Sequence, residues 1–257
     1  GGGGYGSLVL LINDNSGLYE GSIISCVAIA IIPLIVWLAQ HGTIFKPDWK
    51  VKTYATALTF AALLIPVGTQ ARTGLVCIAV LALLFIRQTK RRFLYLAGAA
   101  VIGLAAIPFL PSAFSQRMET IQDYKADESA ATRVAVWKWT WEFVKEHPFG
   151  GGFDAYRINK IRYDLPVVDE NGFDTGAVER REIVDQGRAY HSSFFEMLGE
   201  QGFPGLIIWL LIHVGGVWRM EMVARMYKKR NRADESWVAP LATALQNAQI
   251  IYLVGSL

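Results

Sequence analysis

The stretch GSIISCVAIAIIPLIVWLAQ, residues 21–40, decides what kind of protein this is. It contains no charged residue, and a helix needs about 20 predominantly apolar residues to cross a bilayer. Over the whole chain, 53% of the residues are hydrophobic and only 18% are charged. The composition therefore predicts a membrane protein, and a net charge of +3 is too small to indicate a nucleic-acid partner.

Further stretches of the same kind follow along the chain, and the last begins near Val238 and reaches the chain end. The complete ones are residues 53–69, 73–87, 93–110 and 203–218. The sequence thus predicts an all-α polytopic membrane protein with about six transmembrane helices and one large, partly helical extracytoplasmic loop. Because the chain lacks an initiator Met and stops within an apolar run, we expect a fragment with helices missing at one or both ends.

Lysine and arginine predict the orientation, because short cytoplasmic loops are enriched in both. The basic connections are residues 41–52, 87–92 and 219–232. Placing all of them in the cytoplasm agrees with strict alternation of the spans and makes the long loop periplasmic in a bacterial inner membrane. The expected parts are residues 1–110 (an extracytoplasmic segment and helices 1–4), 111–202 (the catalytic loop) and 203–257 (helices 5–6, the last one truncated).

Within the long loop, two helices are predicted. The first runs from Glu128 to Glu146, ends at His147-Pro148, and would bury one apolar face. The expected apolar face consists of Val134, Trp137, Trp141 and Val144. The second helix is expected over about 188–201, stopping at Gly202-Phe203-Pro204, and residues 158–187 between the two are expected to form an irregular flap.

Arg72 stands at the extracytoplasmic start of a predicted span, where a guanidinium is costly unless it meets water, a partner or an anion. An interfacial anchor that extends to the headgroups is the plainer interpretation. Its polar or small neighbours Gln70, Thr73 and Gly74 favour a water-filled cavity instead.

His191 would share one face of the predicted second helix with Phe194, Phe195 and Leu198. A histidine on such a face is more often a core residue. A neutral imidazole is also the usual acceptor of a proton from a hydroxyl group. The residues alone leave both interpretations open.

The predicted loop is rich in arginine. The planar guanidinium group is suited to bidentate contact with phosphate. The arginines are Arg117, Arg133, Arg157, Arg162, Arg180, Arg181 and Arg188. Ion pairing with the many acids of the loop is the alternative. Cys26 and Cys77 lie in apolar runs and are expected to be buried thiols; no spacing typical of a metal site is present, so we expect neither a metal nor a cofactor.

Several of these features recur in one order along a known family. The order is Arg72-Thr73-Gly74, Arg133 to Trp137, the run from His147 to Phe153, and His191-Ser192-Ser193 to Gly202. This order resembles the O-antigen ligase and polymerase family, and within it the putative O-glycosylation ligases associated with exosortase A systems. The Asn13-Asp14-Asn15 run near the N-terminus is similar to that subgroup.

The resemblance implies a metal-independent, inverting glycosyltransferase that uses a polyprenyl-diphosphate-linked glycan and a lipid, glycan or protein acceptor at the membrane. His191 matches the essential loop histidine of the family and Arg72 its arginine at the end of a span. Arg133, Arg157 and Arg188 are expected to help to bind the diphosphate. Many members have Asn where this chain has Ser192. The alternatives are a polymerase of the same family, a transporter of the lipid-linked glycan, and a structural partner of an export complex.

Overall fold

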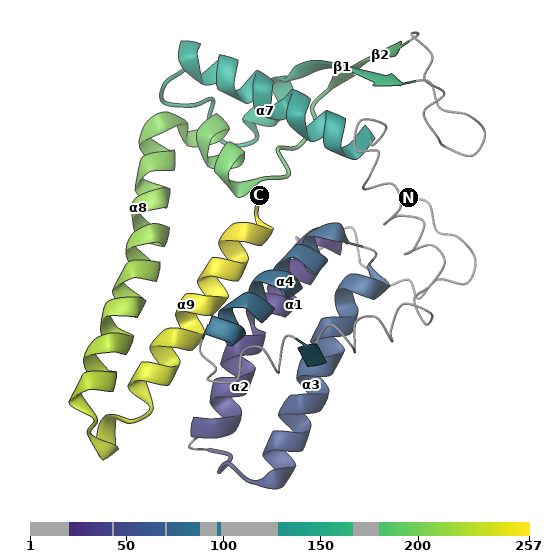
Figure 1. Cartoon of the computed structure of the whole chain (residues 1–257). Coiled ribbons are helices and arrows are strands. Elements are labelled where there is room, and N and C mark those ends of the chain that lie inside the picture. The colour runs from purple at the N-terminus through teal and green to yellow at the C-terminus, as the bar shows by residue number, and fades with distance from the viewer. Residues whose placement is uncertain (1–20, 43, 70, 88–96, 99–127, 167–179) are drawn as a thin grey trace. The chain divides into compact units, whose positions relative to one another are not determined.

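A computed structural model describes residues 21–42, 44–69, 71–87, 97–98, 128–166 and 180–257 (Figure 1). The predicted span at 93–110 falls outside the described residues except for 97–98, as do Arg117 and the N-terminal Asn13-Asp14-Asn15 run. The chain forms two compact units. The first comprises residues 1–114 and 213–255, and the second comprises residues 115–212 and 256–257.

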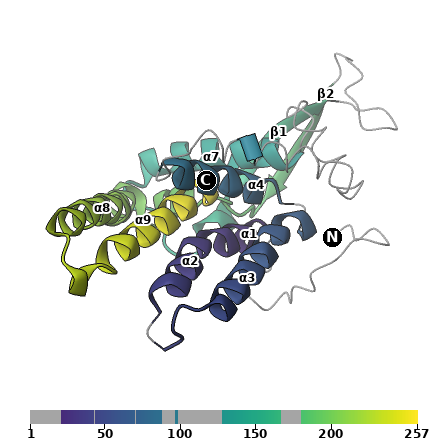
Figure 2. The ribbon, with the colours of Figure 1, turned by 60° about the horizontal axis from the view of Figure 1, so that its bottom comes forward.

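The first unit is a bundle of helices that Figures 1 and 2 both show packed side by side. Its elements are α1 (Gly21–Ala30), α2 (Ile32–His41), α3 (Trp49–Gly68), α4 (Arg72–Arg87), the later part of α8 (Ser193–Arg230), the 3₁₀ turn η3 (Ala233–Glu235) and α9 (Val238–Gly255). The buried core joins Cys26 and Ile29 of α1 with Cys77 of α4 and Ile251 of α9. Both cysteines are buried, as the sequence predicts.

The apolar stretch 21–40, which the sequence predicts as a span, is helical over Gly21–His41 with one interruption at Ile31. α1 ends at Ala30 and α2 begins at Ile32, with Pro33 in the first turn of α2. Proline has no N–H to donate to the carbonyl of Ile29, and the helix is interrupted at Ile31, two residues before the ring.

At the start of α3, the Asp48 side chain accepts a hydrogen bond of 2.8 Å from the Val51 N–H and caps the helix.

Among the described residues, three helical stretches are long and apolar enough to cross a membrane: Gly21–His41, Trp49–Gly68 and Ser193–Arg230. The predicted spans at 73–87 and from Val238 are also helical, over Arg72–Arg87 and Val238–Gly255. The fold is therefore mostly helical, and it is that of a helical membrane protein.

The second unit contains α7 (Glu128–Glu146), the 3₁₀ turn η2 (Ala155–Ile158), strands β1 (Lys160–Pro166) and β2 (Arg180–Gln186), and the first part of α8. The two strands pair antiparallel, with Tyr163 opposite Ile183, and α7 packs along β1 (Figures 1 and 2). The prediction of an irregular flap is thus wrong at both strands, and the fold is not purely α-helical. Alternation explains β1, since Ile161 and Tyr163 are buried and Arg162 between them is exposed.

Helix α7 has the predicted bounds but buries only part of the predicted apolar face, Val144 and the half-buried Trp137. Val136, Thr140 and Val144 are fully buried, whereas Val134 and Trp141 are exposed. Thr140 tolerates burial because its hydroxyl donates a hydrogen bond of 2.8 Å to the carbonyl of Val136. The predicted apolar face is therefore wrong at Val134 and Trp141.

A glycine turn binds the backbone of α8 where that helix is interrupted. Gly202 has φ 68° and ψ −163°, so helical geometry fails at the place where the sequence predicts a helix end. The Gly151 and Gly152 N–H groups donate to the carbonyls of Gly199 and Glu200, each at 2.9 Å. The Phe203 N–H in turn donates to the Pro148 carbonyl, also at 2.9 Å. We call the turn at residues 147–154, with its partners at 199–203, the glycine clamp.

The glycine clamp predicts different costs for two similar substitutions. Gly150 and Gly152 share a left-handed φ, 80° and 81°, but a Cβ on Gly150 would lie 2.3 Å from the Glu200 carbonyl oxygen, whereas one on Gly152 would meet nothing within 4 Å. We expect Gly152→Ala to cost about 1 kcal/mol of unfolding free energy, from backbone strain alone. Gly150→Ala should cost a further ~1–3 kcal/mol through the clash.

The measurement is the thermal unfolding midpoint of the solubilised protein, followed by tryptophan fluorescence. Gly152→Ala serves as the matched control, because it carries the same strain without the clash. Equal losses of stability in both variants would show that contact with α8 does not hold the turn.

Candidate functional site

His191 lies in the short segment between β2 and α8, not on a helix. Helix α8 begins only at Ser193, so the predicted helix over 188–201 is wrong at its first turns. His191 has a left-handed φ of 50° and an exposed side chain. Residues other than glycine seldom adopt this conformation, which the surrounding structure must therefore impose.

The residues on both sides of His191 are held in place. Tyr190 is 2% exposed, and its carbonyl accepts a hydrogen bond of 2.9 Å from the Trp137 indole N–H. Ser192 is buried as well, and the Ser193 N–H donates to the Ser256 carbonyl at 2.9 Å. Burial of Tyr190 and Ser192 pulls the chain away from helical geometry and leaves the imidazole between them at the surface.

Tyr190 links this segment to α8. Its ring packs so closely against Gly199 that a Cβ there would lie 2.3 Å from the phenol oxygen. The phenol oxygen is buried and has no hydrogen-bond partner among the described residues. Burial, followed by the negative charges of Glu200 and Glu196, raises the pKa of Tyr190. The phenol therefore remains neutral and keeps its proton.

Glu200 connects α8 to the glycine clamp. The residue is buried, and one of its carboxylate oxygens accepts a hydrogen bond of 2.9 Å from the Asp154 N–H. Nearby, the rings of Trp137 and Phe195 stack with centroids 4.8 Å apart and planes only 3° from parallel. These contacts join α7, the clamp and the start of α8 around the His191 segment.

Three of the predicted diphosphate-binding arginines lie in the same unit as His191. Arg133 is half-buried on α7. Arg157 forms an ion pair of 3.0 Å with Asp154, and Arg188 pairs with Asp185. Arg188 holds the pKa of the Asp185 carboxyl below its ordinary value through their hydrogen bond.

Buried Asn159 holds the backbone of Gly187 and Arg188 in place. Its side-chain amide donates to the Arg188 carbonyl at 2.7 Å and accepts from the Arg188 N–H at 3.1 Å. The carbonyl of Asn159 also accepts from the Gly187 N–H, at 3.1 Å. Sequence reasoning missed Asn159, because a single buried asparagine in a polar loop carries no distinguishing pattern.

Arg72 belongs to the other unit, where it is the first residue of α4 and is half-buried. The turn before it is tight: the Ala71 N–H donates to the Pro66 carbonyl, and the Gly74 N–H donates to the Ala71 carbonyl, each at 3.1 Å. These bonds fix the backbone at the start of α4. The role of Arg72 stays a prediction.

Metal ligands do not gather in the part of the chain that the structure describes: no three His, Cys, Asp or Glu side chains there are arranged to hold an ion. The candidate groups of the second unit are instead the exposed imidazole of His191, the buried neutral phenol of Tyr190 and the guanidinium groups of its arginines. Such groups can accept a proton, donate hydrogen bonds and bind an anion.

Comparison with known proteins adds the family. No curated protein matches the chain. Residues 1–43 match the model of a family of unknown function, DUF5935. Residues 57–210 match the family model described as O-antigen ligase, and this range includes both Arg72 and His191. Because that match covers more than half of the sequence, the chain belongs to the O-antigen ligase family.

Proposed function

We propose that this protein transfers a glycan from a polyprenyl-diphosphate carrier to an acceptor hydroxyl group at the extracytoplasmic face of the bacterial inner membrane. The family supports a membrane enzyme of the ligase or polymerase type. We further propose that it belongs with the O-glycosylation ligases of exosortase A systems. The support is the glycine-rich start followed by Asn13-Asp14-Asn15, and the residues Arg117-Met118, Thr120-Ile121 and Tyr124.

The observation that carries the proposal is the conformation of His191. An exposed imidazole on a left-handed backbone, fixed by buried neighbours on both sides, is a costly arrangement. Backbone strain of this kind costs about 1–3 kcal/mol and is concentrated at functional sites. A core histidine would be buried instead, so exposure favours the catalytic interpretation over the core one.

In the proposed reaction, the imidazole of His191 accepts the proton of the acceptor hydroxyl. The acceptor oxygen forms a bond to the anomeric carbon, and the bond from that carbon to the diphosphate oxygen breaks with its electron pair. Attack from the face opposite the diphosphate inverts the anomeric centre. The imidazolium then returns its proton to solvent.

Arginines are proposed to bind the departing diphosphate, with Arg72 as the main contact and Arg133, Arg157 and Arg188 as helpers. Preorganised donors of this kind stabilise the charge that develops on a leaving group. The ion pairs Arg157–Asp154 and Arg188–Asp185 are accessible to solvent. A solvent-accessible ion pair stabilises the folded state by only about 0–1 kcal/mol. A diphosphate can therefore compete with Asp154 and Asp185 for these guanidinium groups.

The first test removes the imidazole. We expect His191→Ala to lower the rate of glycan transfer by about 10²–10⁴-fold, which is the usual contribution of a general base. The measurement is transfer from a lipid-diphosphate glycan by membranes that contain equal amounts of inserted protein. His41→Ala is the control, since His41 stands in the connection predicted to be cytoplasmic and should tolerate the change. Full activity of His191→Ala would remove His191 from the mechanism.

A second test concerns the charge at the start of α4. We expect Arg72→Ala to lower transfer by about 10²–10³-fold, because a preorganised donor to the developing charge is lost. Arg72→Lys should recover only part of this loss, because lysine keeps the charge without the bidentate geometry. Exposed Arg219 on α8 provides the control, Arg219→Ala, which should transfer normally. A simple membrane anchor at Arg72 would instead be replaced fully by lysine.

A third test separates ligase from polymerase, which share one architecture and differ only in the acceptor. In cells that lack this gene, we expect lipid-linked polymer to accumulate, as a missing ligase requires. The measurement is the mass distribution of lipid-linked and transferred glycans. Accumulation of single lipid-linked repeats would assign the polymerase reaction, and unchanged glycans would argue against both.

A further inference from the structure

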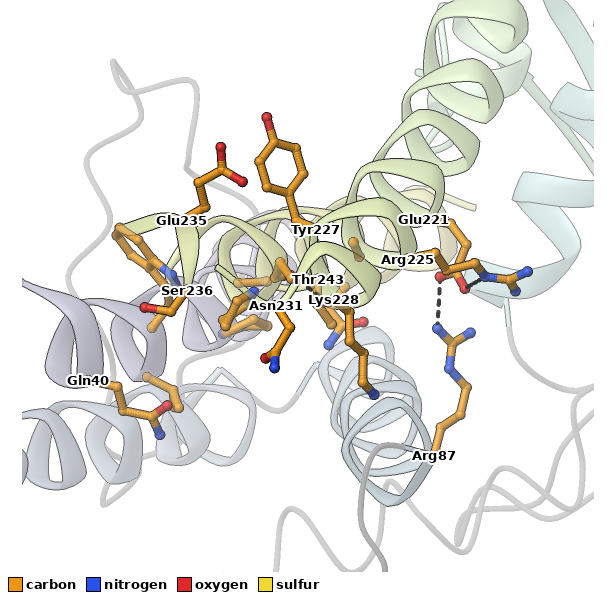
Figure 3. A pocket seen from close by; sticks show the side chains of 18 of the residues that line it. Gln40, Arg87, Glu221, Arg225, Tyr227, Lys228, Asn231, Glu235, Ser236 and Thr243 are labelled. Atoms are coloured by element: carbon orange, nitrogen blue, oxygen red, sulfur yellow. Dashed lines mark hydrogen bonds and ion pairs between the residues drawn. The ribbon is translucent and has the colours of Figure 1, made fainter. Parts of the chain in front are cut away.

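A pocket of about 760 Å³ lies within the first unit, apart from the residues proposed for glycan transfer. It is formed where α2, α4 and α8 end and α9 begins (Figure 3). The connections 41–52 and 87–92 follow α2 and α4, whereas the predicted connection 219–232 is helical as far as Arg230, the last residue of α8. The lysines and arginines of all three segments predict a cytoplasmic position. The pocket is therefore expected at the inner leaflet.

The lining of the pocket is basic on balance. Four cationic side chains face two carboxylates there: Arg87, Arg225, Lys228 and Arg232 against Glu221 and Glu235. Figure 3 shows Arg87 and Arg225 converging on Glu221, at 3.2 Å and 2.7 Å. The single negative charge of Glu221 is therefore shared by two guanidinium groups, and a net positive charge remains that can attract an anion. Among the described residues, Lys228 makes no ion pair.

A buried polar atom also borders the pocket. Asn247 on α9 is 3% exposed, and its Oδ1 has no hydrogen-bond partner among the described residues. Leaving a buried acceptor unpaired costs about 1–3 kcal/mol. A ligand that fills the pocket and donates a hydroxyl hydrogen would remove this cost. Cations together with an unpaired acceptor indicate an anion that also carries hydroxyl groups.

Apolar and aromatic side chains complete the pocket. Trp37 of α2 and Phe85 of α4 line it with Ala239 and Pro240 of α9. The Trp37 indole N–H is already bonded to the Trp237 carbonyl at 3.2 Å, so the ring offers apolar surface and no donor. A ligand with a charged, hydroxyl-bearing end and an apolar part would match both halves of the lining.

We propose that this pocket binds a phosphate ester that carries free hydroxyl groups, and that its source is the glycerol-phosphate headgroup of an anionic phospholipid in the cytoplasmic leaflet. Basic pockets between membrane helices on that side are suited to anionic headgroups. The arginines and Lys228 take the phosphate, and Asn247 accepts a hydrogen bond from a headgroup hydroxyl. The proposal does not rest on glycan transfer.

The experiment measures lipid binding to the purified chain by native mass spectrometry, with phosphatidylglycerol against phosphatidylcholine. We expect phosphatidylglycerol to bind preferentially, and Lys228→Gln to weaken its binding about fivefold, the usual contribution of one basic side chain near an anionic surface. Lys229→Gln is the matched control, because Lys229 follows Lys228 on α8 and is also exposed but does not line the pocket. Equal weakening by both variants, or no preference for phosphatidylglycerol, would overturn the proposal.

A second variant tests the buried acceptor. Asn247→Leu keeps the branched shape of the side chain and removes the unpaired oxygen, so the protein without lipid should be as stable as the wild type or more so. The increase in thermal midpoint on adding phosphatidylglycerol should shrink, because the hydroxyl loses its acceptor. An unchanged increase would contradict the assigned contact.

Soluble glycerol 1-phosphate distinguishes the two sources of the same chemistry. We expect it to displace phosphatidylglycerol only at far higher concentration, since it lacks the apolar part that the lining fits. Displacement at equal concentration would overturn the lipid source and assign a water-soluble phosphate ester to the pocket.

Discussion

Helix α8 loses its helical hydrogen bonds at Gly202, and the backbone groups released there find partners in the glycine turn. The carbonyls of Gly199 and Glu200 accept from Gly151 and Gly152, and the Phe203 N–H returns a bond to Pro148. Buried backbone groups without partners cost about as much as a lost hydrogen bond. The interruption of α8 therefore needs replacement partners, and here two sequence-distant glycine segments provide them. The packing around His191 in the second unit depends on these replacement hydrogen bonds.

From the clamp, one continuous series of contacts leads to His191. The Asp154 N–H bonds to the Glu200 carboxylate, and Gly199 on the same turn of α8 leaves room for the Tyr190 ring. Tyr190 is then buried in the core of α7 and β1, and Trp137 holds its carbonyl. The next residue, His191, is exposed and adopts a left-handed backbone. The strain at His191 is thus a consequence of packing that begins at the clamp.

Local sequence signals predicted the features that depend on local chemistry. The end of α7 follows from His147-Pro148, and the interruption of α8 follows from Gly202-Phe203-Pro204, because proline and glycine act on their immediate neighbours. The apolar helices follow from the length of the uncharged runs. In each case the determining atoms lie within a few residues of the effect.

Features that depend on distant partners were not predictable in this way. The β1–β2 pairing joins segments separated by the polar stretch 167–179. Helix α7 buries the face with Val136 because that residue packs with Ile161 and Tyr163 of β1. The helix expected over 188–201 starts late because Tyr190 packs against α7 and β1. A helical pattern cannot reveal a competing burial of this kind. The same limit applies to Asn159 and Glu200, whose roles are set by backbone groups far along the chain.

The local pairing of the loop arginines bears on how a diphosphate would be both bound and released. Arg157 and Arg188 each have a carboxylate three residues earlier, Asp154 and Asp185. An unpaired arginine cluster would bind a diphosphate tightly and also retain it after the reaction. A weak exposed ion pair gives the guanidinium an alternative partner of nearly equal free energy, so the anion can displace the carboxylate and later be displaced by it. Asn159 bonds to the N–H and the carbonyl of Arg188, so the proposed exchange requires no movement of that backbone.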